Sequence, residues 1–475
     1  MKPTPWLSYL FDIRVWLASS LILHMFGLIE PPLEPGTTWR QTDTLIIARN
    51  FYEGAGQIFF PVTDVAGDKS GIVGCEFPIF NYLISLLSIP FGFHDWFGRL
   101  INLLVSTTGI YFFYRSIRDW FGERPAFFAA AIMLVSLWFT YSRTSIPDTF
   151  AASLIMIALF YGIRYLYKSS PWDLLIFTVL ACLGCLSKIS SASLLTVLFI
   201  PFIYGATTIR HKVYFFLSSA LILAVVGAWY FYWVPHLQTF GLTNFFMGMR
   251  YTSGAEMLIS EWQITLKRFY FTAIKFSGFA VFIAAVCWAI IRKKHLALAC
   301  FAIPFAVYSM MLLKIAVGFI LDAYYVVMFL PPMAFIAGIW LAELKPKWGY
   351  LLILVVATEG VSNQIHEFDL REKQKPWLTL ESQLNTVSSR NDRIAISGME
   401  VDEPTPMYMA HRRGWVLTID VLGKNETWTD LARRGCRFIV FAKMHGNVSI
   451  DQSPVSESEH FVVYKLEPSV SPVSL

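Results

Sequence analysis

Residues 213–235 read VYFFLSSALILAVVGAWYFYWVP and contain no charged side chain. Because a helix needs roughly 20 mostly apolar residues to cross the hydrocarbon core of a bilayer, this stretch predicts a transmembrane helix. Comparable stretches lie at about 14–30, 97–117, 125–142, 148–167, 172–187, 189–208, 269–291, 296–315, 323–343 and 347–362. The sequence therefore predicts about eleven spans by length. The run at 78–93 is either a twelfth span or a helix lying in the membrane interface.

The composition agrees with a polytopic membrane protein. Hydrophobic residues make up 56% of the 475 residues and charged residues only 15%, whereas a soluble protein of this size would need more charge to cover its surface. The 41 Phe, 16 Trp and 21 Tyr suit helices that face lipid and its interfaces. The net charge of +5 does not indicate nucleic-acid binding, because the basic residues fall in short clusters between apolar runs.

These basic clusters predict the orientation of the chain. They occur at every second loop, beginning after the second span: Arg115, Arg118 and Arg124; Arg164 and Lys168; Arg210, His211 and Lys212; Arg292, Lys293 and Lys294; Lys345 and Lys347. By the positive-inside rule these loops are cytoplasmic. The N-terminus is then cytoplasmic, whereas the loops 31–95 and 236–268 and the C-terminal segment lie outside.

The chain changes character near residue 362. Residues 393–397 and 437–441 predict buried strands, 461–464 predicts a closing strand, and 404–411 and 429–434 predict helices. The fold expected is therefore a mainly α membrane domain over 1–362 followed by a small extracytoplasmic α/β domain over 363–475.

The external loop contains residues that a bilayer does not explain. Residues 39–44 read WRQTDT and place Arg40 three residues before Asp43, and Glu76 follows in the same loop. A structural alternative is that Asp43 caps a helix over 45–52 and that Glu76 faces a helix beginning near Pro78. If they are not helix caps, charged side chains held beside a membrane favour a catalytic or binding role.

Three more charged residues are predicted at the same membrane face. Asp148 opens the fourth span after Pro147, where it also suits the helix dipole, and Arg143 precedes it by five residues. Lys188 lies in the turn between the fifth and sixth spans, where it is either a solvated lysine or a ligand for a lipid phosphate. Arg250, Lys267 and Arg268 in the loop 236–268 have a weaker claim to the same role.

The order of these residues resembles the C-type integral-membrane glycosyltransferases, in particular bacterial relatives of the protein mannosyltransferases and of the lipid A aminoarabinose transferase. The resemblance covers about residues 10–345. It is carried by Asp43, by Glu76-Phe77-Pro78, by Asp148, by Lys188 and by Tyr324, Tyr325, Pro331 and Pro332.

The resemblance implies a sugar donor on polyprenyl phosphate, an active site at the outer face of the bacterial inner membrane, and transfer with inversion to a lipid, glycan or protein hydroxyl. Asp43 would be the general base and Asp148 would orient the acceptor or the sugar. Glu76 would bind sugar hydroxyls or pair with a cation. Arg40, Arg143 and Lys188 would stabilise the leaving phosphate, with Tyr324 and Tyr325 also in the substrate site.

Three departures from the family pattern narrow this interpretation. Thr44 follows Asp43 where many mannosyltransferase-like members have a second acid, and Phe77 stands where aminoarabinose transferases have a lysine. The second departure argues against the aminoarabinose reaction itself. Asp322 precedes the Tyr-Tyr pair where members often carry a histidine.

Two other function classes remain open from the sequence. A transporter or flippase of a lipid-linked or anionic solute would use a similar bundle, but its charges would lie near the middle of the membrane. A non-catalytic envelope-assembly protein is the third class. The nine His are scattered and form no evident metal site. No cofactor is certain, and a divalent cation bridging the acids and the phosphate is left open.

Overall fold

The computed structural model describes residues 12–466 except 35, 206, 243–247, 369, 371, 447–449 and 451. The chain forms two compact units. Unit 1 comprises Met1–Ile29, Trp96–Trp233 and Phe245–Phe368, and unit 2 comprises Glu30–Asp95, Val234–Asn244 and Asp369–Leu475.

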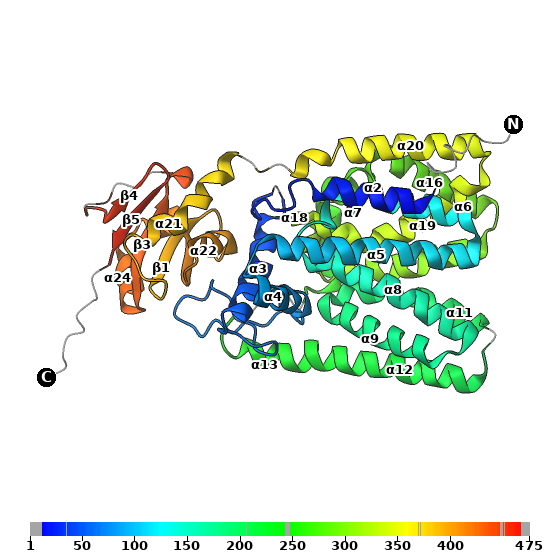
Figure 1. The fold of residues 1–475 in the computed structure, drawn as a ribbon, viewed down its shortest axis with the longest axis horizontal. Helices are drawn as coiled ribbons and strands as arrows, with labels where there is room; N and C mark the ends of the chain where they lie inside the picture. The colour runs from blue at the N-terminus through cyan, green and yellow to red at the C-terminus, as the bar shows by residue number, and fades with distance from the viewer. Residues whose placement is uncertain are drawn as a thin grey trace. The chain divides into compact units, whose positions relative to one another are not determined.

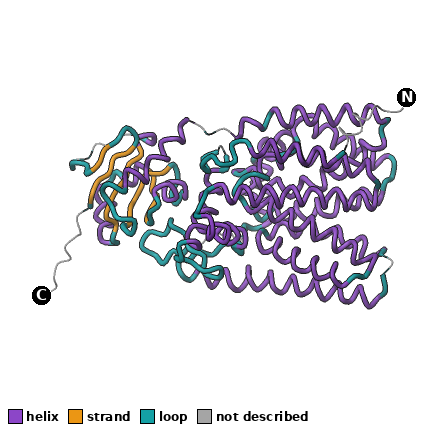
Figure 2. The backbone as a smooth tube through the Cα atoms, viewed as in Figure 1, coloured by secondary structure: helices purple, strands orange, loops and turns teal. Residues whose placement is uncertain are grey.

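Unit 1 is helical, and helices such as α5, α8, α9 and α12 run side by side (Figures 1 and 2). Its α-helices are α2 (Ile13–Met25), α5 (Trp96–Phe121), α6 (Glu123–Val135), α7 (Trp138–Tyr141), α8 (Pro147–Lys168), α9 (Pro171–Ser187), α10 (Ala192–Leu195), α11 (Phe199–Tyr204), α12 (Ile209–Ala228), α14 (Tyr251–Ser260), α15 (Trp262–Lys267), α16 (Lys275–Ile291), α17 (His295–Leu312), α18 (Ala316–Leu321), α19 (Leu330–Glu343) and α20 (Pro346–Ser362). Short 3₁₀ segments η1 (Ile189–Ser191), η2 (Thr196–Leu198), η5 (Ala323–Phe329) and η6 (Ile365–Phe368), and π-helical segments η3 (Trp229–Trp233) and η4 (Arg268–Ala273), complete it.

The mainly helical membrane architecture is confirmed. Among the described residues, four helices are long and apolar enough to cross a membrane: Pro147–Lys168, Ile209–Gln238, His295–Leu312 and Ala323–Glu343. The bent pair Trp262–Ala273 and Lys275–Ile291 makes a fifth if it counts as one span. Each predicted span coincides with helix, but several are shorter or broken, so the total of about eleven stays a prediction.

Unit 2 combines the loop 31–95 with the C-terminal domain. The loop contributes α3 (Thr38–Tyr52) and α4 (Ile79–Phe91), and a further segment contributes α13 (Val234–Gln238). The domain contains η7 (Glu372–Thr379), α21 (Leu380–Leu384), β1 (Arg393–Gly398), α22 (Pro404–Ala410), β2 (Gly414–Thr418), α23 (Ile419–Leu422), α24 (Asn425–Arg433), β3 (Cys436–Ala442), η8 (Lys443–His445), β4 (Ser456–Glu457) and β5 (Phe461–Lys465).

The five-stranded sheet of unit 2 has the order β2-β1-β3-β5-β4. Strand β1 pairs in parallel with β2 and β3, and β5 pairs antiparallel with β3 and β4. Successive side chains of a strand point to opposite faces, so Ile394 and Ile396 join one core with Trp377, whereas Ala395 joins the other with Trp428. The predicted α/β domain is thus confirmed, with β2 and β4 as additional strands.

The loop 31–95 is joined to this domain by backbone hydrogen bonds and by a buried side chain. The backbone of Gly414 in β2 accepts hydrogen bonds from Ala66 and Gly67 and donates one to the Asp64 carbonyl. Leu33, also from the loop, is fully buried in the core of the domain. Because these contacts join segments more than 300 residues apart, the compact units differ from a linear division of the chain at residue 362.

Candidate active site

Arg40 and Asp43 of α3 form a largely buried charged cluster with Glu76, which lies before α4 in the same loop. Arg40 donates from Nη1 to Asp43 at 2.8 Å and from Nη2 to Glu76 at 2.9 Å. Asp43 is 4% exposed and Arg40 is 8% exposed. Because α3 begins at Thr38, Asp43 lies inside the helix, and the alternative that it caps a helix over 45–52 is wrong.

This arrangement raises the pKa of the Asp43 carboxyl. Burial is the main cause that raises its pKa to about 6; the Arg40 guanidinium opposes the rise, and the charge of Glu76 supports it. One cation shared by two carboxylates cannot fully compensate both for the loss of water. The result is a carboxylate that is ionised at neutral pH and readily takes up a proton, as a general base requires.

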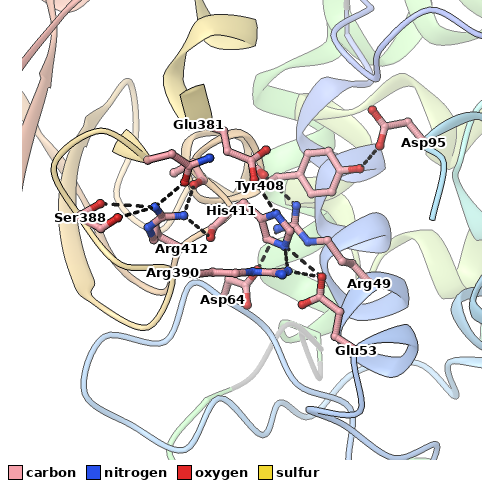
Figure 3. A network of polar contacts seen from close by, with 12 residues as sticks. Arg49, Glu53, Asp64, Asp95, Glu381, Ser388, Arg390, Tyr408, His411 and Arg412 are labelled. Atoms are coloured by element: carbon pink, nitrogen blue, oxygen red, sulfur yellow. Dashed lines mark hydrogen bonds and ion pairs between the residues drawn. The ribbon is translucent and has the colours of Figure 1, made fainter. Parts of the chain in front are cut away.

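The C-terminal domain fixes α3 along its length. Next to Asp43, the Thr42 hydroxyl lies 3.2 Å from the Thr405 hydroxyl of α22. Two turns on, Arg49 donates to the Tyr408 carbonyl and to the Asp64 carboxylate, each at 3.1 Å, and its guanidinium lies 4.6 Å from the centre of the Tyr408 ring (Figure 3). These contacts restrict the rotation and translation of the helix that carries the candidate base.

A second group of contacts lies at the C-terminal end of α3 (Figure 3). The imidazole of His411 faces the Glu53 carboxylate at 3.0 Å from Nε2 and the Glu381 carboxylate at 2.9 Å from Nδ1. Arg390 also contacts Glu53. The C-terminal domain therefore contacts α3 through a hydroxyl pair in its N-terminal half and through charged groups at its C-terminal end.

Unit 1 contains a second cluster of the predicted site residues. Lys188 Nζ lies 3.2 Å from Oδ1 of Asp148, and both side chains are nearly buried. The ammonium also lies 5.4 Å from the centre of the Tyr324 ring and 5.1 Å from that of Tyr325. Four residues predicted from distant parts of the sequence thus meet in one place, and Asp322, which accepts a hydrogen bond from the Tyr324 hydroxyl at 3.0 Å, adjoins them.

The chain geometry explains this meeting. Pro147 occupies the first turn of α8, where its missing N–H costs nothing, so Asp148 follows at the helix N-terminus. Lys188 has extended backbone angles between the end of α9 and η1. Its side chain therefore leaves the helix axis instead of continuing the apolar face of α9.

Asn102 of α5 holds the turn before Asp148. Its side-chain amide is fully buried and donates to the carbonyls of Tyr141, Thr144 and Ile146 at 3.1, 2.7 and 3.3 Å. Asn102 is not among the site residues predicted from the sequence. Its only signal was a single Asn inside an apolar span, a position where a polar side chain is costly unless it is bonded.

Arg143 is bound to the backbone of its own unit. It donates to the carbonyls of Phe26 and Gly27 at 3.0 and 2.8 Å, and its guanidinium lies 4.0 Å from the centre of the Phe368 ring. These contacts give Arg143 a structural role, and its predicted role towards phosphate stays a prediction. Arg268 similarly donates to the carbonyls of Phe319 and Ile320.

Comparisons with known proteins agree with this architecture. The sequence profile of the dolichyl-phosphate-mannose-protein mannosyltransferases matches residues 75–233. The crystal structure of ArnT from Cupriavidus metallidurans in the apo state superposes with a TM-score of 0.62 at 13% identity, covering 96% of this chain and 98% of that chain. The chain has the fold of the C-type membrane glycosyltransferases.

Two further structures with the C-type fold extend the comparison. ArnT from Cupriavidus metallidurans bound to undecaprenyl phosphate gives a TM-score of 0.58 at 13% identity, over 96% of this chain and 98% of that chain. The apo oligosaccharyltransferase of Archaeoglobus fulgidus gives 0.53 at 12% identity, over 90% of this chain and 70% of that chain. No curated protein matches the sequence.

The described side chains were also compared with the ligand sets that hold metal ions. In the part of the chain that the structure describes, no group of three or more His, Cys, Asp or Glu side chains could hold a metal ion. Between Asp43 and Glu76 the positive charge is supplied by Arg40. The divalent cation that the sequence left open stays a prediction.

Proposed function

We propose that this protein transfers a sugar from a polyprenyl-phosphate donor to an extracytoplasmic acceptor hydroxyl, with inversion at the anomeric carbon. The acceptor oxygen forms a bond to the anomeric carbon while the bond from that carbon to the phosphate oxygen breaks. The acceptor proton passes to Asp43, and polyprenyl phosphate leaves with the bonding electron pair. The acceptor is a lipid, a glycan or a protein.

The observation that carries this proposal is the buried Asp43 with its pKa of about 6. A hydroxyl is a weak nucleophile, and a carboxylate within hydrogen-bond reach activates it by accepting its proton as the new bond forms. Arg40 keeps the carboxylate ionised near neutral pH without supplying a proton, since a guanidinium does not titrate in this range. In this proposal Glu76 orients Arg40 and binds sugar hydroxyls.

The leaving phosphate needs cationic stabilisation instead of a strong acid. We assign this role to Lys188, whose flexible ammonium is a compact charge for a phosphate oxygen. Asp148, at 3.2 Å, orients the lysine and competes with the phosphate for it. Tyr324 and Tyr325 border the lysine and form the wall of the donor site.

We place this multi-pass protein in the bacterial inner membrane, and the positive-inside rule supports an orientation with the N-terminus in the cytoplasm and unit 2 outside. A solved structure with the same fold is bound to undecaprenyl phosphate, which supports a polyprenyl-phosphate donor. No specific observation favours the transporter class, because the Asp148–Lys188 pair lies at the N-terminal end of α8 and not midway along it.

The test is a mass-spectrometric comparison of polyprenyl-phosphate sugars and envelope glycans from cells that express wild type, Asp43→Asn or Asp402→Asn. Asp402 is a carboxylate of the C-terminal domain and serves as the matched control. We expect a donor to accumulate and one glycan mass to disappear only in Asp43→Asn, and that mass would name the sugar. Identical glycans in all three strains, with the Asp43 variant folded and abundant, would refute the proposal.

A further inference from the structure

Unit 1 contains a basic cavity at the opposite end of α8 from Asp148. Asp148 is the second residue of α8, and Arg164 and Lys168 lie near its C-terminus. At 1.5 Å per residue, Arg164 is about 24 Å along the helix axis from Asp148. A second site at this end is therefore separate from the candidate catalytic residues and does not rest on the proposed function.

The cavity has a volume of about 1160 Å³ and is bordered by the C-terminal ends of α5, α8 and α11 and the start of α17. The acidic and basic side chains that line it are Arg115, Arg118, Asp119, Arg164, Lys168 and His295. Basic residues from two clusters that are separate in the sequence thus line the same cavity. The positive-inside rule explains their side of the membrane but does not require them to share a cavity.

The acids near this cavity do not balance its cations. Arg118 pairs with Asp119 at 3.0 Å, and Arg164 pairs with Asp173 at 2.8 Å. Arg115 and Lys168 form no ion pair with any described residue. An excess of two positive charges therefore faces a cavity large enough for a lipid headgroup, and charged groups in such a place attract an anion.

An apolar cavity continues from the basic one. The two share Ser116, Trp120 and Ile163, and the apolar one extends past Leu159 and Val197. It is narrow, with a free volume of about 90 Å³. A basic space that continues into an apolar one suits an amphiphile, because a soluble anion gains nothing from the apolar part.

Aromatic side chains border the junction. Trp120 and Tyr167 line the basic cavity and pack edge to face with ring centres 5.5 Å apart. Trp and Tyr are enriched where the headgroups of a bilayer meet its hydrocarbon. Their position agrees with a lipid whose phosphate lies among the cations while its chain enters the apolar cavity.

We propose that this cavity binds an anionic phospholipid, with the phosphate held by Arg115 and Lys168 and the start of one acyl chain between Ile163 and Val197. Such a lipid would fill the end of the bundle where α5, α8, α11 and α17 meet. The basic cavity selects a ligand with a negative headgroup, and the apolar cavity selects one with an acyl chain.

The experiment measures lipid retention by native mass spectrometry of the full-length protein, titrated with phosphatidylglycerol or with zwitterionic phosphatidylcholine. We expect wild type to bind one phosphatidylglycerol at least tenfold more tightly than phosphatidylcholine. The double variant Arg115→Gln/Lys168→Gln should lose this preference. The matched control, Arg210→Gln/Lys212→Gln, removes the same charge from the start of α12 and should keep it.

Three outcomes would overturn the inference. Equal retention of the two lipids by wild type would exclude a specific site. Equal losses in the cavity variant and the control would indicate attraction to the whole basic surface. Competition by glycerol 1-phosphate as effective as that by phosphatidylglycerol would indicate a soluble anion. If the double variant does not fold, Lys168→Gln alone serves as the test, because Lys168 is exposed. This single variant should weaken phosphatidylglycerol binding at least threefold.

Discussion

The pKa of Asp43 predicts an acid limb in the pH dependence of transfer. With a pKa of about 6, the carboxylate is about 90% ionised at pH 7 and about 10% ionised at pH 5, so the rate should fall about tenfold between these values. An unperturbed aspartate, with a pKa near 3.9, would stay more than 90% ionised at pH 5 and the rate would hardly change.

Two substitutions that leave Asp43 intact should move this limb in opposite directions. Glu76→Gln removes a negative charge that raises the pKa of Asp43, so the limb should move to lower pH. Arg40→Gln removes the cation that lowers it, so the limb should move to higher pH. A shift in opposite directions is not expected from a general loss of structure.

The assay is the initial rate of transfer by the purified protein in nanodiscs between pH 4.5 and 8, with the donor identified by the glycan comparison. A sugar–phosphate–polyprenol is a phosphodiester and stays ionised over this range, so the donor does not contribute a limb. The interpretation is refuted if the wild-type rate at pH 5 is nearly the same as at pH 7, or if Glu76→Gln leaves the limb in place while the variant melts like wild type.

The remaining predictions concern the residues that bind or position. Lys188→Gln should raise the KM for the donor about tenfold or more, because a charge-assisted contact to phosphate contributes about 1.5–3 kcal/mol; an unchanged KM would remove the lysine from the phosphate site. Asn102→Asp should lower both the melting temperature and the transfer rate. Three carbonyls would lose their donor, and each unsatisfied carbonyl costs up to about 1–3 kcal/mol. A lower rate with an unchanged melting temperature would contradict a positioning role for Asn102. Arg49→Met should increase amide exchange in α22 at least tenfold while α8 is unaffected, because removing one partner of a buried ion pair costs about 3–5 kcal/mol; hydrogen-exchange mass spectrometry checks this.

Long periodic or apolar stretches were predicted well because their pattern is local. The span expected over 148–167 is observed as Pro147–Lys168, and the strand expected over 393–397 is observed as Arg393–Gly398. The helix expected over 429–434 begins earlier, at Asn425. Strand β2 was not predicted because it has only five residues and begins with Gly414, and glycine weakens the pattern of a strand.

The pairings within the candidate site could not be predicted from the sequence. Asp148 and Lys188 are 40 positions apart, and their contact depends on the packing of α8 against α9 and on the extended backbone of Lys188. The sequence left open whether Glu76 binds sugar or pairs with a cation, and the structure shows it paired with Arg40. The attachment of the loop 31–95 to the sheet depends on backbone hydrogen bonds of Gly414, which no side-chain pattern reveals.

The contacts of α3 give a physical reason for packing the C-terminal domain against this helix. Isolated helices of about 15 residues are marginal in water, and α3 buries Arg40, Asp43 and Arg49 along with its apolar side chains. The raised pKa of Asp43 is itself a cost: the folded state binds the proton more tightly than the unfolded chain. The proton on Asp43 therefore stabilises the folded state fully below about pH 4. This stabilisation is lost as the pH rises through 6, which lowers the free energy of unfolding by roughly 3 kcal/mol. At neutral pH the helix must be held by other contacts, and those of Arg49 with Tyr408 and Asp64 supply them. On this argument the C-terminal domain offsets the instability of a carboxylate kept basic enough to accept a proton.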